Sequence, residues 1–245
     1  MKNSIPRYAL ATALLITTSF AKADIALDLT KLPSAQGWLY NNDGNGVQEG
    51  NVFSTVSGTL LQNSLGVNNY GPGSSRYDLF EALVPGQSYA LTFTAILTGE
   101  ERSTSNNHWA FGAGYFDGKG GEYGVGLGTG VVQTEWATYV LDTSQKHTYK
   151  IVGTSAANGA SAKGQLWVDG NFIGGGNATD YGSCSGLGKY CNSVYIGDGT
   201  SGPNASGTYF SLSVAAVPEP ETFAMLLAGL GLIGAAVKRR KAKQA

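Results

Sequence analysis

The middle of this chain consists of short stretches in which apolar and polar residues alternate, separated by Gly, Asn, Asp, Ser and Pro. Successive side chains of an extended strand point to opposite faces, so the alternation gives each stretch one apolar face. No stretch repeats its apolar residues every 3.6 positions, as helical connectors between parallel strands would. We therefore predict an all-β fold, an antiparallel sandwich or barrel. The predicted strands span residues 51–56, 88–97, 108–111, 123–127, 148–152, 165–168, 193–196 and 208–214.

Turn residues mark two hairpins within this pattern. Asp169–Gly170 separates residues 165–168 from Phe172–Ile173, and both residue types accept the positive φ of a tight primed turn. The glycine-rich segment 118–121 is the predicted tip of a second hairpin. The sequence contains no repeat of 20 to 50 residues, which disfavours a propeller or a solenoid.

The first 23 residues are a predicted secretory signal peptide. Two basic residues come first, residues 8–20 are mostly apolar, and Ala21 and Ala23 are the small residues that a signal peptidase requires. Cleavage after Ala23 leaves Asp24 as the first residue. A membrane-spanning N-terminal helix is the alternative, but the apolar region is too short and contains Thr and Ser.

Residues 217–245 contain three parts: a proline-rich start at 217–220, uncharged residues at 222–237 and basic residues at 238–243. The prolines hold the chain extended, so a helix begins after them. At about 1.5 Å per residue the uncharged run is roughly 24 Å long, and flanking Lys and Arg side chains can snorkel to complete a span. We predict a single transmembrane helix with its basic end in the cytoplasm. A buried core helix is the alternative, and the charge that follows disfavours it.

The order of these three parts resembles the PEP-CTERM sorting signal of Gram-negative bacteria. The residues that carry the resemblance are Val217, Pro218, Glu219, Pro220, Lys238, Arg239, Arg240 and Lys241. The resemblance implies that the protein is exported and held briefly in the inner membrane by its tail. An exosortase, a membrane cysteine transpeptidase, then processes it near the triplet. The implied partners are signal peptidase and exosortase, and the implied destination is the cell surface or the extracellular matrix.

Charge supports the same division of the chain. All seventeen acidic residues, but only eight of the sixteen basic ones, lie between Asp24 and Glu221. The middle segment is therefore acidic, and the two ends are basic. Nucleic-acid binding needs clustered Lys and Arg to neutralise phosphates, so this composition excludes it.

Four segments resemble the closing part of a concanavalin A-like or laminin G-like jelly roll. They are His147–Val152, Gly164–Gly170, Val194–Gly199 and Gly207–Val214. The resemblance implies one jelly-roll domain over residues 24–216, with a fibronectin-like or other β-sandwich as the alternative. Jelly rolls host both lectins and glycoside hydrolases, so the fold does not decide the activity.

The two cysteines, Cys184 and Cys191, enclose a short loop that contains glycine. Outside the cytoplasm, a close and even pair is typical of a disulfide. The spacing is not that of a C-x-x-C redox motif, and no second pair completes a metal site.

The sequence shows no local catalytic motif. Hydrolases of the jelly-roll class carry E-x-D-x-x-E on one strand, whereas here Glu100–Glu101 are adjacent and Asp117 and Glu122 flank a turn. His108 and His147 lie far apart, and no serine sits in a G-x-S-x-G elbow. We predict no catalytic residues, no metal site and no enzyme activity. Carboxylates paired over a longer range stay open as an alternative.

A loop at residues 41–46, followed by Gln48 and Glu49, is rich in the oxygen ligands that calcium prefers. The same residue types are common in tight turns, and the spacing differs from that of an EF-hand. We predict a turn, with calcium binding as the alternative.

Aromatic residues beside Gly and Asn are the remaining sign of a binding site, because sugars stack on rings and hydrogen-bond to nearby polar groups. The candidate ligand-binding residues are Trp38, Asp43, Asn45, Tyr115 and Tyr123. Trp109 and Trp167 lie in alternating stretches and are expected in the core.

The function we predict is that of an exported, non-catalytic carbohydrate-binding or structural module of the cell surface or matrix, with an extracellular polysaccharide as its partner. A glycoside hydrolase of the concanavalin A-like fold is the alternative. A hydrolase must present two carboxylates about 5 to 10 Å apart in a groove.

Overall fold

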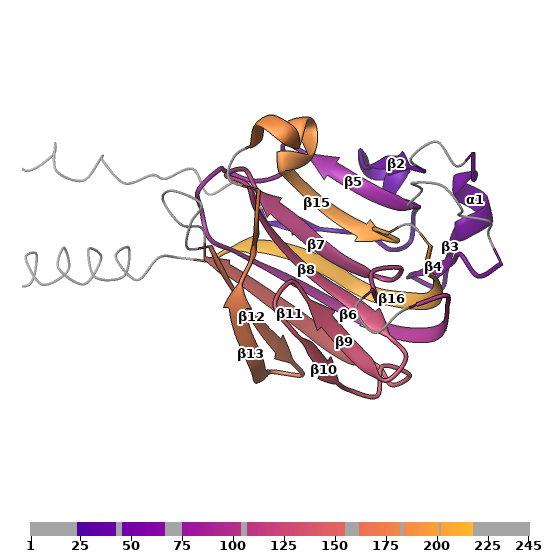
Figure 1. Cartoon of the computed structure of the whole chain (residues 1–245). Helices are drawn as coiled ribbons and strands as arrows, with labels where there is room; N and C mark the ends of the chain where they lie inside the picture. Colours follow the sequence, from indigo (N-terminus) through magenta and orange to yellow (C-terminus); the bar gives the residue numbers. More distant parts are fainter. Residues whose placement is uncertain are drawn as a thin grey trace, which may run out of the picture.

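The computed structural model describes residues 24–42, 46–66, 75–103, 107–154, 162–181, 184–200 and 202–217. These residues form two antiparallel sheets of eight strands each, which stack as a sandwich (Figure 1). The all-β prediction and the antiparallel sandwich are thereby confirmed. The predicted signal peptide and the predicted membrane helix lie outside the described residues.

Sheet A has the order β13-β12-β11-β6-β16-β4-β3, with β1 paired to β16. Its strands are β1 (Ile25–Ala26), β3 (Phe53–Val56), β4 (Thr59–Asn63), β6 (Tyr89–Glu101), β11 (His147–Thr154), β12 (Lys163–Val168), β13 (Asn171–Asn177) and β16 (Asn204–Ala216).

Sheet B has the order β10-β9-β8-β7-β15-β5-β2, with β14 paired to β8. Its strands are β2 (Leu39–Asn41), β5 (Arg76–Phe80), β7 (Gly112–Asp117), β8 (Gly121–Gly128), β9 (Val131–Thr134), β10 (Thr138–Val140), β14 (Thr179–Asp180) and β15 (Asn192–Gly197). The short helical turns of the described chain are η2 (Pro33–Gln36), α1 (Glu49–Val52), η3 (Cys184–Gly186) and η4 (Gly188–Cys191).

The strands predicted between residues 88 and 214 are confirmed, with one exception. The prediction at 108–111 is wrong, because this segment is a turn. Its backbone bonds to β8 at one point only, where Leu127 N donates to Phe111 O at 2.8 Å. Gln62 donates to Ala110 O at 2.6 Å, and His108 N donates to Gln133 Oε1 at 2.7 Å. Buried backbone groups must find partners, and here two glutamine side chains supply bonds that a strand ladder would otherwise make. The strand predicted at 51–56 begins only at Phe53, after α1.

Tyrosine side chains join the two sheets through the core. The Tyr115 hydroxyl donates to Tyr89 O at 2.9 Å, and the Tyr209 hydroxyl donates to Gly112 O at 2.9 Å. Each bond links a strand of sheet A to a strand of sheet B. A buried hydroxyl without a partner costs free energy, so these bonds let large polar rings fill an apolar layer.

The hairpin predicted at Asp169–Gly170 is confirmed. These residues have φ values of 51° and 80° and join β12 to β13. Ser57 and Gly58, with φ values of 50° and 76°, make a similar turn between β3 and β4. Both turns have positive φ at two successive positions, the conformation that matches the twist of antiparallel strands.

The disulfide between Cys184 and Cys191 is confirmed, with the two Cα atoms 5.3 Å apart. It joins η3 to η4, directly before β15. Asn192, the first residue of β15, exchanges hydrogen bonds with the Leu83 backbone at 2.9 and 2.7 Å. The start of β15 is therefore fixed both covalently and through its side chain.

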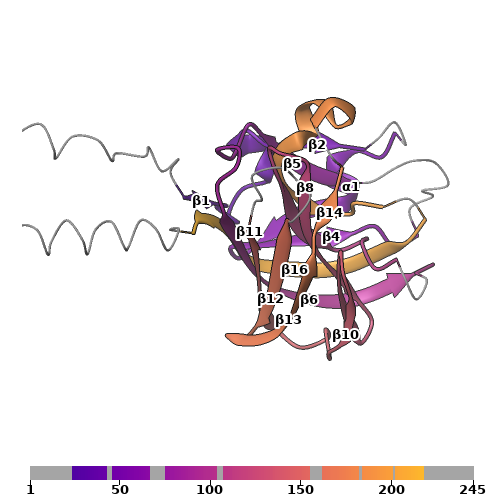
Figure 2. The same ribbon diagram turned by 60° about the vertical axis from the view of Figure 1, so that its left-hand side comes forward.

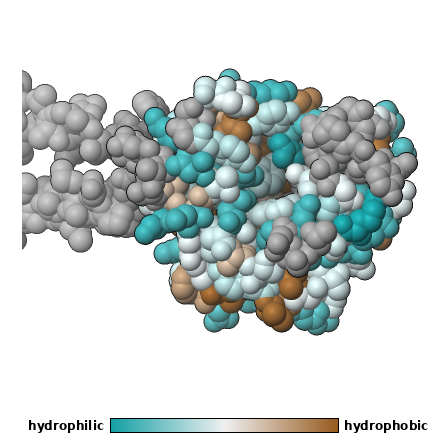
Figure 3. Space-filling view, viewed as in Figure 1, coloured by the Kyte–Doolittle hydropathy of each residue, from teal (hydrophilic) through white to brown (hydrophobic). Residues whose placement is uncertain are grey.

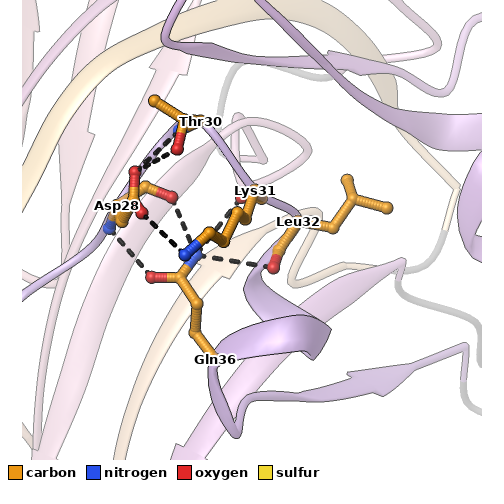
Figure 4. Close-up of polar contacts among 5 residues, drawn as sticks. All are labelled: Asp28, Thr30, Lys31, Leu32 and Gln36. Carbon is orange, nitrogen blue, oxygen red and sulfur yellow. Dashed lines mark hydrogen bonds and ion pairs between the residues drawn. The ribbon is translucent and has the colours of Figure 1, made fainter.

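The loop between β1 and η2 is closed by one amide side chain. Gln36 accepts from Asp28 N at 2.9 Å and donates to Asp28 O at 2.8 Å (Figure 4). The Asp28 carboxylate accepts from Thr30 N at 3.0 Å and lies 3.5 Å from Lys31 Nζ. Gln36 thus pairs with the backbone of Asp28 as a neighbouring strand would.

The two ends of the described domain meet at one pole (Figure 2). Ile25 in β1 pairs with Val214 in β16, and Val217 N donates to Ser88 O at 2.9 Å. Across the described residues, every helix is too short or too polar to traverse a bilayer.

The exposed apolar side chains lie mainly on edge strands. Val140 in β10 is 93% exposed, and Phe172 in β13 is 54% exposed. Figure 3 shows apolar residues at the lower edge of the molecule, over β10 and β13, and a mainly polar surface over β15, β7 and β8. The polar surface of sheet B is where the candidate site lies.

Candidate functional site

A pocket of about 330 Å³ lies on the outer face of sheet B. Tyr115 and Tyr123 point to the inner face, where their rings stack with centroids 4.9 Å apart. Because faces alternate along a strand, Phe116 and Glu122 point outward. The residues that line the pocket are Arg76, Trp109, Gly112, Ala113, Phe116, Glu122, Val125, Glu135, Tyr181, Tyr195, Gly197 and Gly199. Its volume is at the lower end of the range of small-molecule sites, roughly 300 to 1,000 Å³.

Two glycines lie directly beneath side chains that line the pocket. A Cβ atom at Gly124 would lie 2.5 Å from the Tyr195 hydroxyl and 2.9 Å from Trp109 Cζ3. A Cβ atom at Gly114 would also collide with the Tyr195 hydroxyl. The aromatic rings can lie against the sheet only because these two positions carry no side chain.

Two glutamates on neighbouring strands share the pocket. Glu122 accepts from the Tyr195 hydroxyl at 3.1 Å and from the Tyr181 hydroxyl at 2.9 Å. Glu135, directly after β9, accepts from Thr179 Oγ1 at 2.7 Å through Oε2. Glu135 Oε1 lies 3.1 Å from the position that a Cβ atom at Gly124 would occupy. Thr179 pairs with Glu122 between β14 and β8, which brings both carboxyl groups to one place.

The two carboxyl groups have different protonation states. Burial raises the pKa of Glu122, against the hydrogen bonds from Tyr181 and Tyr195 and the charge of Arg76. Burial, followed by the charge of Glu122, raises the pKa of Glu135 to about 8. A pKa of about 8 leaves Glu135 protonated at neutral pH, whereas two phenol hydrogen bonds and Arg76 stabilise the charge of Glu122.

Arg76 forms one wall of the pocket. Its Nε lies 3.1 Å from Asp78 Oδ2, and the Asp78 side chain is fully buried. The guanidinium carbon lies 5.2 Å from the centre of the Tyr195 ring and 5.4 Å from that of Tyr190. The ion pair and the two rings fix the guanidinium beside the carboxyl pair.

The structure places the sequence-predicted ligand residues elsewhere. Trp38, Tyr115 and Tyr123 are 5%, 1% and 0% exposed, so their rings pack in the core and present no free face to a ligand. The odd-numbered residues of β7 and β8 point inward, which is the physical reason for the last two. Asp43 and Asn45 lie outside the described residues.

Trp109 and Trp167 are the opposite case, since both were expected in the core. Each is only partly buried. Trp109 lines the pocket, and Trp167 contacts the exposed Phe172 ring at a centroid distance of 5.3 Å. Sequence reasoning also missed the pairing of Glu122 with Glu135. The alternation around Tyr123 was the one sign that Glu122 faces away from the core.

The described residues contain no group of three His, Cys, Asp or Glu side chains arranged to hold a metal. Glu49, from the loop considered for calcium, accepts from the Tyr77 hydroxyl at 2.6 Å. Both histidines contact carboxylates: His108 Nδ1 lies 2.8 Å from Glu100, and His147 Nδ1 lies 2.6 Å from Asp169. The first contact joins the turn before β7 to β6, and the second joins β11 to the turn after β12.

Comparison with known proteins identifies one segment of the chain. Residues 216–241 match the family model of the PEP-CTERM protein-sorting motif. The chain carries a PEP-CTERM motif. This motif marks an exported protein that an exosortase sorts to the surface, as the resemblance implied. No curated protein matches the chain by sequence.

Several solved structures are similar to this chain at low sequence identity. Alginate lyase Aly36B is 10% identical, with a TM-score of 0.44, over 81% of this chain and 100% of that one. A carbohydrate esterase from the Shiga toxin-encoding bacteriophage phi24B is 11% identical, with a TM-score of 0.46, over 79% and 100%. The lectin-like arcelin-5 of Phaseolus vulgaris is 13% identical, with a TM-score of 0.38, over 80% and 99%. These neighbours include both lectin-like proteins and enzymes, so they do not assign an activity.

Proposed function

We propose that this exported PEP-CTERM protein binds carbohydrate in the pocket on the outer face of sheet B. The observation that supports the proposal best is the combination of aromatic rings and carboxyl groups around one cavity. Trp109, which is only partly buried, supplies apolar surface for stacking, while Glu122 and Glu135 supply directed hydrogen bonds. Sugars need both kinds of contact, because each ring has apolar C–H faces and polar edges.

The protonation states give the pocket both acceptors and a donor. Ionised Glu122 accepts hydrogen bonds from sugar hydroxyls, and protonated Glu135 donates one. Arg76 adds fixed donors, held by Asp78 and by the rings of Tyr190 and Tyr195. The hydroxyls of a sugar can act as donor and acceptor together, which suits such a mixed set.

Binding can be tested with the full chain in a mild non-ionic detergent on a glycan array, using the wild type and Trp109→Ala. We expect the variant to lose at least tenfold in affinity, because it removes a ring that lines the pocket. Trp167→Ala is the matched control, since Trp167 is also partly exposed but lies on sheet A. Circular dichroism checks that both variants fold. The proposal fails if no glycan is retained by the wild type, or if both variants lose affinity equally.

A glycan-cleaving enzyme is the second candidate, favoured by the two carboxyl groups with separate protonation states. In such a mechanism, protonated Glu135 gives its proton to the oxygen of the leaving sugar as the glycosidic bond breaks. Ionised Glu122 either attacks the anomeric carbon or takes a proton from the water that does. Either route ends with water added across the bond.

The two candidates separate in one experiment on Glu122→Gln and Glu135→Gln. An enzyme loses turnover in both variants, by about 10²-fold or more, while it still retains its glycan. A binding protein leaves the chain length of every glycan unchanged in the wild type as well. The measurement is the size distribution of glycans after long incubation, by mass spectrometry.

A further inference from the structure

The outer pocket of sheet B has an excess of negative charge. Its one cation, among the described lining residues, is Arg76, and this is matched by Asp78 at 3.1 Å. Glu122 and Glu135 then remain, with a proton on Glu135 at neutral pH and the uncompensated charge on Glu122. They are bonded to the uncharged hydroxyls of Tyr181, Tyr195 and Thr179 rather than to a Lys or Arg.

Given the proposed carbohydrate site, we propose that this pocket selects a sugar carrying a positively charged amino group, such as an unacetylated hexosamine, over neutral sugars and uronates. An ammonium group has donors and no acceptor, which complements two carboxyl groups whose partners are donors. A uronate would place its carboxylate beside ionised Glu122, and like charges in a partly buried site repel strongly.

The aromatic rings of the pocket favour the same ligand. Tyr195, Trp109 and Glu135 all approach Gly124 closely, so the two rings lie beside the Glu135 carboxyl group. A cation over the face of such rings is attracted by their π electrons, most strongly where water is excluded. Arg76 already uses this attraction at Tyr195, with its guanidinium 5.2 Å from the ring centre. An ammonium ion beside the two carboxyl groups meets their oxygens together with the partly exposed Trp109 ring.

The proton held by the carboxyl pair competes with a bound cation. Glu135 faces Glu122 from β8 and Thr179 from β14. Glu122 in turn faces Tyr181, Tyr195 from β15 and Arg76 from β5. Both phenol groups stay neutral in the working range, since burial raises their pKa values. A ligand with a permanent positive charge should therefore bind more tightly as the pH rises past about 8, where Glu135 ionises.

Titration calorimetry on the full chain in detergent, with three soluble oligosaccharides, tests the inference. The probes are an oligomer of glucosamine, the same oligomer fully N-acetylated, and an oligouronate of equal length. We expect the free amine to bind roughly tenfold more tightly than its N-acetylated form, and the uronate not to bind. An N-trimethylated glucosamine oligomer keeps its charge at every pH, so its affinity should rise between pH 7 and pH 9.

Glu122→Gln, which removes the charge of the pocket at pH 7, should bring the affinity for the amine close to that for the N-acetylated oligomer, and Glu135→Gln should remove the rise with pH. Asp142→Asn is the matched control, because it removes one negative charge from an exposed turn that does not line the pocket. Equal binding of the amine and its N-acetylated form overturns the selectivity and leaves carbohydrate binding in place. Retention of the uronate alone overturns it as well. If none of the oligosaccharides binds and the glycan array is also negative, the proposed function fails together with this inference.

Discussion

The outer faces of the two sheets follow the same alternation but are built differently. On sheet A, Thr94 bonds to Thr148 across β6 and β11 at 2.9 Å. On sheet B, Gly114 and Gly124 occupy the equivalent outward positions of β7 and β8. Threonine fills and stiffens a sheet surface, whereas glycine leaves room that the rings of Tyr195 and Trp109 occupy. The difference shows that aromatic residues can lie flat on a sheet only where the residues beneath them lack side chains.

The largest effect is expected from the pH dependence of stability. The pKa of Glu135 is about 8 in the folded protein, against 4.5 as the ordinary value, so the folded state holds the extra proton. The contribution of Glu135 to the free energy of unfolding is then fully present below about pH 4.5 and is lost as the pH rises through about 8, on the order of a few kcal/mol after screening by solvent. Sheet A should contribute no comparable change. The measurement is urea unfolding of the full chain in detergent across this pH range.

Glu135→Gln isolates this contribution. Asp198, whose pKa burial also raises to about 8, acts in the same direction and is present in both proteins. The difference between wild type and variant therefore reports Glu135 alone. An equal pH slope in the two proteins would show that Glu135 is not held protonated by the fold.

The next largest effect is expected from adding a methyl group at Gly124, beneath the rings of Tyr195 and Trp109. Gly124→Ala places a methyl group where the Tyr195 hydroxyl and Trp109 now lie. We expect a loss of about 1 to 3 kcal/mol in unfolding free energy and a loss of glycan binding. Gly50→Ala is the control, because a Cβ at Gly50 in α1 meets open space. If glycans bind the Gly124→Ala variant as tightly as the wild type, the ligand lies elsewhere.

The smallest effect is expected on the outer face of sheet A. A double-mutant cycle with Thr94→Val and Thr148→Val should give a coupling energy of roughly 0.2 to 1 kcal/mol, as for other pairs across neighbouring strands. Glycan binding should be unchanged in all three variants. If these variants change glycan binding more than Gly124→Ala does, the ligand binds the outer face of sheet A.

The features that sequence reasoning could predict are those that depend on neighbours in the chain. The turn at Asp169–Gly170 follows from two residue types, and the disulfide follows from two cysteines seven positions apart. The sorting signal is likewise contiguous, and residues 216–241 carry it.

The pocket could not be predicted in this way because it depends on pairing between distant segments. Glu122 and Glu135 meet only because β9 and β14 both lie beside β8. Trp109 reaches the pocket because side chains from β4 and β9 bond the turn before β7. The alternation predicts which residues of a strand share a face, but it does not predict which sheet carries the pocket on its outer face.

The pairing of β1 with the end of β16 has a practical consequence. Because Ile25 and Val214 are strand partners, a short peptide could join the first and last described residues without crossing the domain. New termini could then be opened at the Ser57–Gly58 turn of sheet A, leaving every strand of sheet B unbroken. In such a circular permutant, the outer face of sheet B would have a new orientation relative to any partner fused to the termini.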